Sequence, residues 1–191
     1  MKKFKALDKG EYQYINNRKH RLLLFSSLSL LVVLIIFLTG IIIYHTNKSI
    51  FAVIAAVSAL PAAKLVTLYA VIIPYNTGDK TIYDRLCELK AKQKGVIVCD
   101  LAIASSTKTS FIQFAYIADE KVILYTDYKK IDINYAEKYI KDILNQNCNF
   151  SSVKLYTDKK KFLERAEGFS QLEEENSMDR RIADKLISFS M

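Results

Sequence analysis

The sequence predicts an α+β fold in which an N-terminal two-helix transmembrane hairpin precedes one cytosolic domain. Two observations lead to this prediction. Two long apolar runs fill residues 22–74, and the segment 79–191 carries helical and strand patterns in succession. The order expected in that segment is α-β-β-β-α-β-α-α, with its four strands in one mixed sheet.

The first apolar run, residues 22–44, contains no charged residue across its 23 positions. As a helix it would be about 34 Å long, enough to cross a hydrocarbon core of about 30 Å. A secretory signal peptide has a shorter apolar region that ends in small residues, whereas this run ends with Ile41-Ile42-Ile43-Tyr44. The run therefore predicts a membrane span.

The second run, residues 49–74, is interrupted by a single charge. Because so few residues separate the two runs, the helices are expected to return antiparallel as a multi-pass hairpin. Residues 1–21 form a basic tail with seven basic and two acidic residues, a net of +5, whereas the intervening loop offers only Lys48. The positive-inside rule then places both termini in the cytosol.

Lys64 is the charge inside the second run, and it lies about 15 Å of helix before Pro74. A lysine at the centre of a span costs on the order of 2.5–3.5 kcal/mol on insertion scales, which makes it a functional hypothesis. The structural alternative is that Ser26 and Ser29 of the first span, carbonyls freed by Pro61, or water satisfy its ammonium group.

The second run is also rich in small residues, which permit close helix packing within the hairpin or between copies. We therefore expect the lipid bilayer as one partner and a homo-oligomer formed through the hairpin as another. These residues are Ala55, Ala56, Ser58, Ala59, Ala62 and Ala63.

The formal net charge of +8 does not indicate nucleic-acid binding. From residue 76 onward, 19 basic residues face 18 acidic ones, so the basic excess is concentrated beside the membrane. We expect the tail to rest on anionic lipid headgroups.

The segment 79–191 is expected to begin with a helix over residues 79–94. Thr81 with Asp84 three residues later resembles a capping pair, and Gly95 ends the pattern. A turn at Asp119-Glu120 separates the last two of three apolar runs, which predict an antiparallel meander covered on both faces. The three runs are residues 96–104, 111–118 and 122–126.

The remaining elements are expected from capping residues and periodicity. They are a helix from Asn134, with Glu137, to about Asn147; a strand at 152–156; a short helix from Asp158 to Glu167; and a final helix opened by Ser170 with Glu173.

Residues 124–130 and 155–161 repeat each other at six of seven positions, and each closes a predicted strand. A strand that runs into a helix or turn favours Asp as a cap and tolerates lysines beyond it. If the intervening helix is a crossover, the two strands are parallel, and Asp127, Lys129, Asp158 and Lys160 emerge at one sheet edge. Such a cluster is a candidate site for a metal or a phosphate-bearing ligand.

The predicted order resembles that of the PD-(D/E)xK nuclease-like fold, and Asp127-Tyr128-Lys129 is similar to the Asp-x-Lys half of its motif. The resemblance implies a metal-dependent nuclease or phosphodiesterase that uses Mg or Mn, with Asp100 or Asp119 as the second carboxylate. The Asp-x-Lys triplet stands at the end of its strand, and no Pro-Asp pair precedes it.

Other catalytic signatures are not seen. His20 and His45 both lie outside residues 79–191, which excludes a histidine triad or a histidine metal site in the domain. Cys87, Cys99 and Cys148 have no short spacing, so neither a disulfide framework nor a zinc site is expected. No cofactor is predicted outside the nuclease alternative, and the sequence leaves enzyme activity open.

As a whole, the chain resembles a group of small two-span membrane proteins of Gram-positive bacteria with no assigned activity. The similar stretches are Gly10-Glu11-Tyr12, Tyr14-Ile15, Arg18-Lys19, Leu60-Pro61-Ala62-Ala63-Lys64, Tyr156-Thr157-Asp158 and Lys161-Phe162-Leu163-Glu164-Arg165. The resemblance implies a bacterial cytoplasmic membrane. We expect the domain to be a binding or assembly module for an unknown protein or small-molecule partner, with the membrane-tethered nuclease as the alternative.

Overall fold

The computed structural model of the chain describes residues 7–44, 50–105, 108–148, 150, 152–169 and 176–190. Its elements divide into two units. One is Ile15–Pro74, and the other joins Met1–Tyr14 to Tyr75–Met191. The second unit contains the sheet and is called the domain below.

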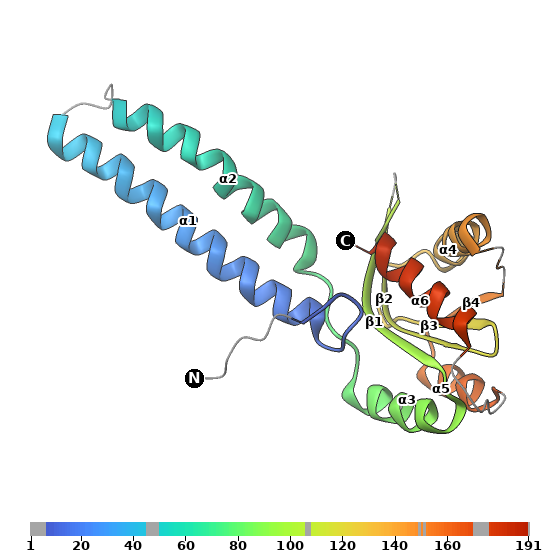
Figure 1. Ribbon diagram of the computed structural model, residues 1–191. Helices are drawn as coiled ribbons and strands as arrows, with labels where there is room; N and C mark the ends of the chain where they lie inside the picture. The colour runs from blue at the N-terminus through green and yellow to red at the C-terminus, as the bar shows by residue number, and fades with distance from the viewer. Residues whose placement is uncertain are drawn as a thin grey trace. The chain divides into compact units, whose positions relative to one another are not determined.

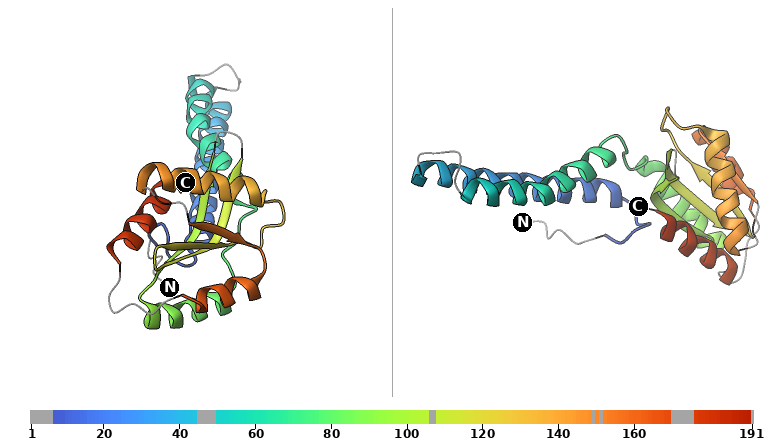
Figure 2. Two further views of the ribbon diagram at one scale, coloured as in Figure 1. Left: turned by 90° about the vertical axis from the view of Figure 1, so that its right-hand side faces the viewer. Right: turned by 90° about the horizontal axis from the view of Figure 1, so that it is seen from above.

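The first unit is a pair of helices, α1 (Tyr14–Tyr44) and α2 (Ile50–Ile72), which lie side by side along their length (Figures 1 and 2). Both are long and apolar enough to cross a membrane. Only 6% of the apolar window of α1 and 11% of that of α2 are buried, unlike the core helices of a soluble domain. The predicted hairpin of helices is confirmed.

The helix bounds differ from the predicted spans at the start of α1 and at the end of α2. α1 begins at Tyr14 rather than at residue 22, because no proline or glycine interrupts the polar residues before the apolar run. α2 ends at Ile72, since the residue before Pro74 disfavours helical backbone. The predicted first residue of that span, Ser49, lies outside the described residues.

The second unit contains a four-stranded sheet in the order β1-β2-β3-β4. β1 (Val96–Ala104), β2 (Thr109–Ala118) and β3 (Lys121–Tyr125) form the predicted antiparallel meander. β4 (Val153–Tyr156) pairs with β3 in parallel, and α4 (Ile133–Cys148) is the crossover between them. The predicted mixed sheet and element order are confirmed.

Helices cover both faces of this sheet (Figure 1). On one face, α4 and α6 (Ser177–Phe189) bury residues such as Ile140 and Leu186 against the strands. On the other, α3 (Lys80–Gln93) and α5 (Lys159–Glu167) bury residues such as Leu86 and Phe162. This three-layer arrangement explains the continuous apolar strands, because side chains on both faces leave water.

Helix starts are the main local difference from the sequence prediction. α3 is capped by Asp79, which accepts the Thr81 amide at 3.0 Å, and α4 by Asp132, which accepts the Tyr135 amide at 3.2 Å. In each case an aspartate just before the predicted cap accepts the first free amide, so the helix begins there. Asp158 caps α5 as predicted.

The final helix also starts elsewhere than predicted. α6 is capped by Asn176, whose side chain accepts the Met178 amide at 2.9 Å. The predicted cap, Ser170 with Glu173, lies outside the described residues.

The predicted tight turn between β2 and β3 is confirmed. Asp119 and Glu120 both have φ of 52°, as two-residue hairpin turns of type I′ require. The buried carboxylate of Asp179 on α6 accepts the Glu120 amide at 3.1 Å. The turn is therefore held from the α4/α6 face of the sheet.

Candidate functional site

The repeated sequence forms a pair of matched strands. Leu124 is paired with Leu155 and Tyr125 with Tyr156 in the parallel β3–β4 ladder, and the Thr126 amide continues it by donating to the Tyr156 carbonyl at 3.1 Å. Both copies of the repeat therefore end at one edge of the sheet, which brings Asp127 and Asp158 to that edge as the crossover argument predicted.

The side chains at this edge have mainly structural partners. Asp158 accepts the amides of Lys160 and Lys161 at 2.8 and 3.4 Å as the N-cap of α5. Asp127 is exposed, and its amide donates to the buried Gln113 side chain at 3.2 Å. Lys129 and Lys160 are exposed as well, so none of the four predicted residues is held in a closed pocket.

Lys159, which sequence reasoning did not select, joins α5 to α3 at this edge. Its ammonium group lies 2.9 Å from the Asp79 carboxylate and 2.5 Å from the Thr81 hydroxyl. The hydrogen bond from Lys159 and those from Thr81 lower the pKa of Asp79 to about 2. This link fixes two helix N-termini next to each other.

The two carboxylates offered for the nuclease alternative lie at different places. Asp100 is buried in β1 with φ of 53°, and it accepts the Thr77 hydroxyl at 2.7 Å. Asp119 pairs with Lys121 at 2.6 Å at the opposite end of β3 from Asp127, about 16 Å away for five strand residues. Asp119 therefore cannot share a metal ion with Asp127, whereas Asp100 lies opposite Gln113, whose side chain accepts the Asp127 amide.

The part of the chain that the structure describes contains no group of three or more His, Cys, Asp or Glu residues suited to a metal ion. A requirement for Mg or Mn stays a prediction, and Asp100 and Asp127 are its remaining candidates.

Within the helical hairpin, Lys64 lies on the exposed surface of α2. The hydroxyls of Ser26 and Ser29 donate to the carbonyls of Leu23 and Ser26 on their own helix, at 3.0 and 2.9 Å. The small residues Ala55 and Ala62 are buried, in agreement with close helix packing. These bonds use the hydroxyl protons and leave the oxygen lone pairs as acceptors, so the pairing of Lys64 with the two serines stays a prediction.

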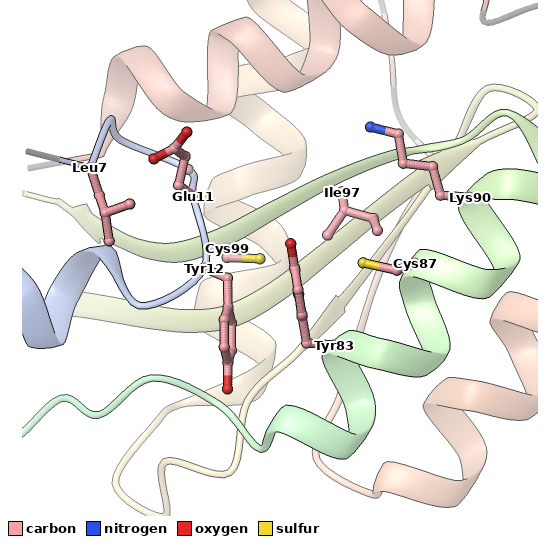
Figure 3. A pocket seen from close by; sticks show the side chains of 9 residues that line it. Leu7, Glu11, Tyr12, Tyr83, Cys87, Lys90, Ile97 and Cys99 are labelled. Carbon is pink, nitrogen blue, oxygen red and sulfur yellow. The ribbon is translucent and has the colours of Figure 1, made fainter. Parts of the chain in front are cut away.

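A cavity of about 480 Å³ lies in the domain between residues 7–12, α3 and β1 (Figure 3). Sequence reasoning missed it, because it forms only when the segment before α1 docks on the domain. Its lining residues are Leu7, Gly10, Glu11, Tyr12, Tyr83, Cys87, Lys90, Ile97 and Cys99.

Three contacts hold the segment 8–12 in place. The Cys99 amide donates to the Gly10 carbonyl at 2.8 Å, so the segment extends the free edge of β1. Lys9 donates to the Ser190 carbonyl at 2.8 Å. The Tyr12 ring stacks on Tyr83 with centroids 4.2 Å apart. Of the described part of the predicted basic tail, residues 7–21, the stretch 7–14 belongs to the domain and residues 15–21 belong to α1.

Acidic, basic and neutral polar groups line this cavity. Glu11 and Lys90 stand on opposite sides of it, with the Tyr83 hydroxyl between them (Figure 3). Burial, together with a hydrogen bond to Cys87, raises the pKa of Tyr83 to about 12. Burial also raises the pKa of the Cys99 thiol. Both groups are therefore neutral at pH 7 and serve as polar contacts, not nucleophiles.

Comparisons with known proteins give no further assignment: no protein-family model, no curated protein and no solved structure matches the chain.

Proposed function

We propose that the chain is an integral protein of the bacterial cytoplasmic membrane that presents a small binding domain to the cytosol. The observation that carries this proposal is the hydrogen bond between Gly10 and Cys99, which joins the segment before α1 to the domain after α2. Two segments that fold together must lie on one side of the bilayer, so the helices between them must enter and leave by the same face.

The properties of the hairpin and its flanks support this orientation. The apolar windows of α1 and α2 are almost entirely exposed, a state that a bilayer satisfies and water does not. The flank before α1 is basic, which by the positive-inside rule favours the cytosol. The resemblance to two-span proteins of Gram-positive bacteria agrees with a bacterial cytoplasmic membrane.

The cavity beneath residues 7–12 is the best-supported binding site for a small molecule or for a side chain of a protein partner. Its volume falls within the range of small-ligand sites, about 300–1,000 Å³. It offers a carboxylate, an ammonium group and phenol hydroxyls around an apolar floor, which suits a small polar ligand with an apolar body. Homo-oligomerisation through the hairpin stays a prediction.

Cysteine labelling in cells tests the orientation. In the wild type, Cys87 is the exposed cysteine of the domain, so a membrane-impermeant maleimide should label the chain only after the cells are permeabilised. The variant that combines Cys87→Ser with Lys48→Cys moves the accessible thiol to the segment between the helices, and it should be labelled in intact cells. Labelling of Cys87 in intact cells would reverse the proposed orientation.

The metal-dependent nuclease or phosphodiesterase is the second candidate, favoured by the element order and by Gln113, which lies opposite Asp100 and accepts the Asp127 amide. Calorimetric titration of Mn²⁺ into the full chain in detergent tests it. Saturable binding that Asp127→Ala abolishes supports this function and leads to assays with nucleic acids and nucleotides. Absence of binding rejects it.

A further inference from the structure

A second cavity, of about 370 Å³, opens where β3 and β4 begin, on the face of the sheet that α5 covers. It shares no residue with the cavity beneath residues 7–12. Its walls are formed by the first residues of the two parallel strands and by the last turn of α5. The lining residues are Lys121, Val122, Ile123, Ser152, Val153, Lys154, Tyr156, Arg165 and Phe169.

All the charged side chains that line this cavity are basic. Lys121, Lys154 and Arg165 contribute three cations, and none of the lining residues carries a carboxylate. Lys121 pairs with Asp119 at 2.6 Å and Lys154 with Glu137 at 3.5 Å, and the two acidic partners are half-buried. Water still reaches both lysine side chains and screens these pairs, so an anion in the cavity competes with the carboxylates for the two ammonium groups.

Of the three lining cations, Arg165 is the best placed to bind an anionic ligand. Among the described residues, no carboxylate lies within ion-pair distance of its guanidinium group, whose carbon is 6.0 Å from the Phe169 ring centroid. The Lys121 ammonium is also 6.0 Å from that centroid. Phe169 itself is buried and stacks on Tyr116 with centroids 5.9 Å apart, so packing holds the ring in place beside both cations.

We propose that this cavity binds a phosphomonoester group, carried either by a soluble small molecule or by a lipid headgroup. One guanidinium and two ammonium side chains line the cavity, and such groups form charge-assisted hydrogen bonds to phosphate oxygens, with Arg165 as the bidentate fork. The Ser152 hydroxyl, just before the start of β4, is a further hydrogen-bond donor in the lining. The half-buried Tyr156 ring and Phe169 form an apolar wall for the rest of the ligand.

The size of the cavity limits the ligand class. At about 370 Å³ it lies near the lower end of the range for small-ligand sites, about 300–1,000 Å³. It therefore accepts one phosphate with a compact body attached rather than a nucleic-acid strand. The charge from residue 76 onward is nearly balanced, with 19 basic and 18 acidic residues. This balance agrees with a local site and not with an extended basic surface.

The test uses the full chain in detergent and three probes: inorganic phosphate, adenosine monophosphate, and vesicles of phosphatidylcholine with or without phosphatidate. Calorimetric titration follows the soluble probes, and flotation of the reconstituted chain against competing vesicles follows the lipid. Arg165→Gln is the test variant. Arg180→Gln removes the same charge from an exposed position on α6 outside the cavity and is the matched control.

The expected result is saturable binding that Arg165→Gln weakens at least tenfold and Arg180→Gln leaves within twofold. Binding of phosphate or adenosine monophosphate assigns a soluble ligand, whereas specific binding of phosphatidate alone assigns a headgroup. Equal losses in the two variants would show a general charge effect and overturn the proposal. Failure of all three probes to bind would also overturn it.

Discussion

The backbone carbonyl of Gly10 accepts the amide of Cys99 at 2.8 Å, and this bond attaches the segment before α1 to the edge strand of the sheet. Gly10 has φ of +90°, and a Cβ atom there would lie 3.0 Å from both Ile187 and Val98. The cavity of Figure 3 therefore depends on a glycine at this position.

Gly10→Ala is expected to destabilise the docked segment by about 1–2 kcal/mol, because an L-residue is strained at positive φ and its methyl group is crowded. The measurement is hydrogen exchange of the Cys99 amide in the full chain in detergent, which should accelerate about 5–30-fold as the bond opens more often.

Gly168→Ala is the control for this substitution. Gly168 has φ of −78°, and a Cβ atom there would meet its nearest neighbours at ordinary distances of 3.6 and 3.7 Å. Exchange at Cys99 should not change in this variant. Equal acceleration in both variants would mean that Gly10 acts through general stability and not through the docked segment.

Strong local patterns made much of the fold predictable. The apolar run at 96–104 has the bounds of β1, because its side chains leave water on both faces and its one polar residue, Asp100, is buried within the strand. Helix starts were less predictable, since several polar residues compete for the same free amides. Asp79 and Asp132 accept these amides in the structure. The predicted caps, Thr81 and Asn134, each lie two residues later in the sequence.

The buried Asp179 is expected to make stability depend on pH. Burial raises its folded pKa above the ordinary 3.8, so the native state holds this proton more tightly than the unfolded state. Its contribution is therefore favourable at acid pH and is lost as the pH rises through the folded pKa. Wild-type stability, measured against Asp179→Asn by thermal unfolding, should fall as the pH rises above 3.8.

Asp179→Ala separates the charge of this side chain from its hydrogen bond. The variant leaves the Glu120 amide of the β2–β3 turn without its acceptor, which costs about 1–3 kcal/mol relative to Asp179→Asn at any pH. Thermal unfolding at pH 7 should therefore rank Asp179→Ala below Asp179→Asn. The reverse order would show that the turn does not need this acceptor.

The exposed cap Asp79 should show the opposite pH dependence. Lys159 and Thr81 lower its pKa to about 2, below its ordinary 3.8, so its stabilising contribution is complete above pH 3.8 and is lost as the pH falls through about 2. The difference in unfolding temperature between the wild type and Asp79→Ala should shrink over that window. Asp84→Ala, also exposed on α3, should have little effect at any pH, whereas a loss equal to that of Asp79→Ala would restore Thr81-Asp84 as the cap.

The candidate sites were less predictable than the fold. The repeat 124–130 and 155–161 predicted correctly that two strand ends lie together, because a crossover makes the strands parallel, but the four residues selected there line neither cavity. Both cavities depend on residues far apart in the chain, such as Glu11 with Lys90 and Lys121 with Arg165. Such pairs have no local periodicity, so only the folded domain brings them together.

The three cysteines provide an independent test of the docked segment. Cys87 is exposed, whereas Cys99 and Cys148 are buried, and burial and Asp100 raise the pKa of Cys99. A disulfide reagent at pH 8 should therefore modify one thiol per folded chain quickly, and Cys87→Ser should abolish that fast phase. The other two thiols should react only on unfolding in guanidinium.

Gly10→Ala should accelerate the reaction of Cys99 but not that of Cys148, since residues 7–12 cover only the β1 side of the domain. Fast reaction of Cys99 in the wild type would contradict the docked segment itself.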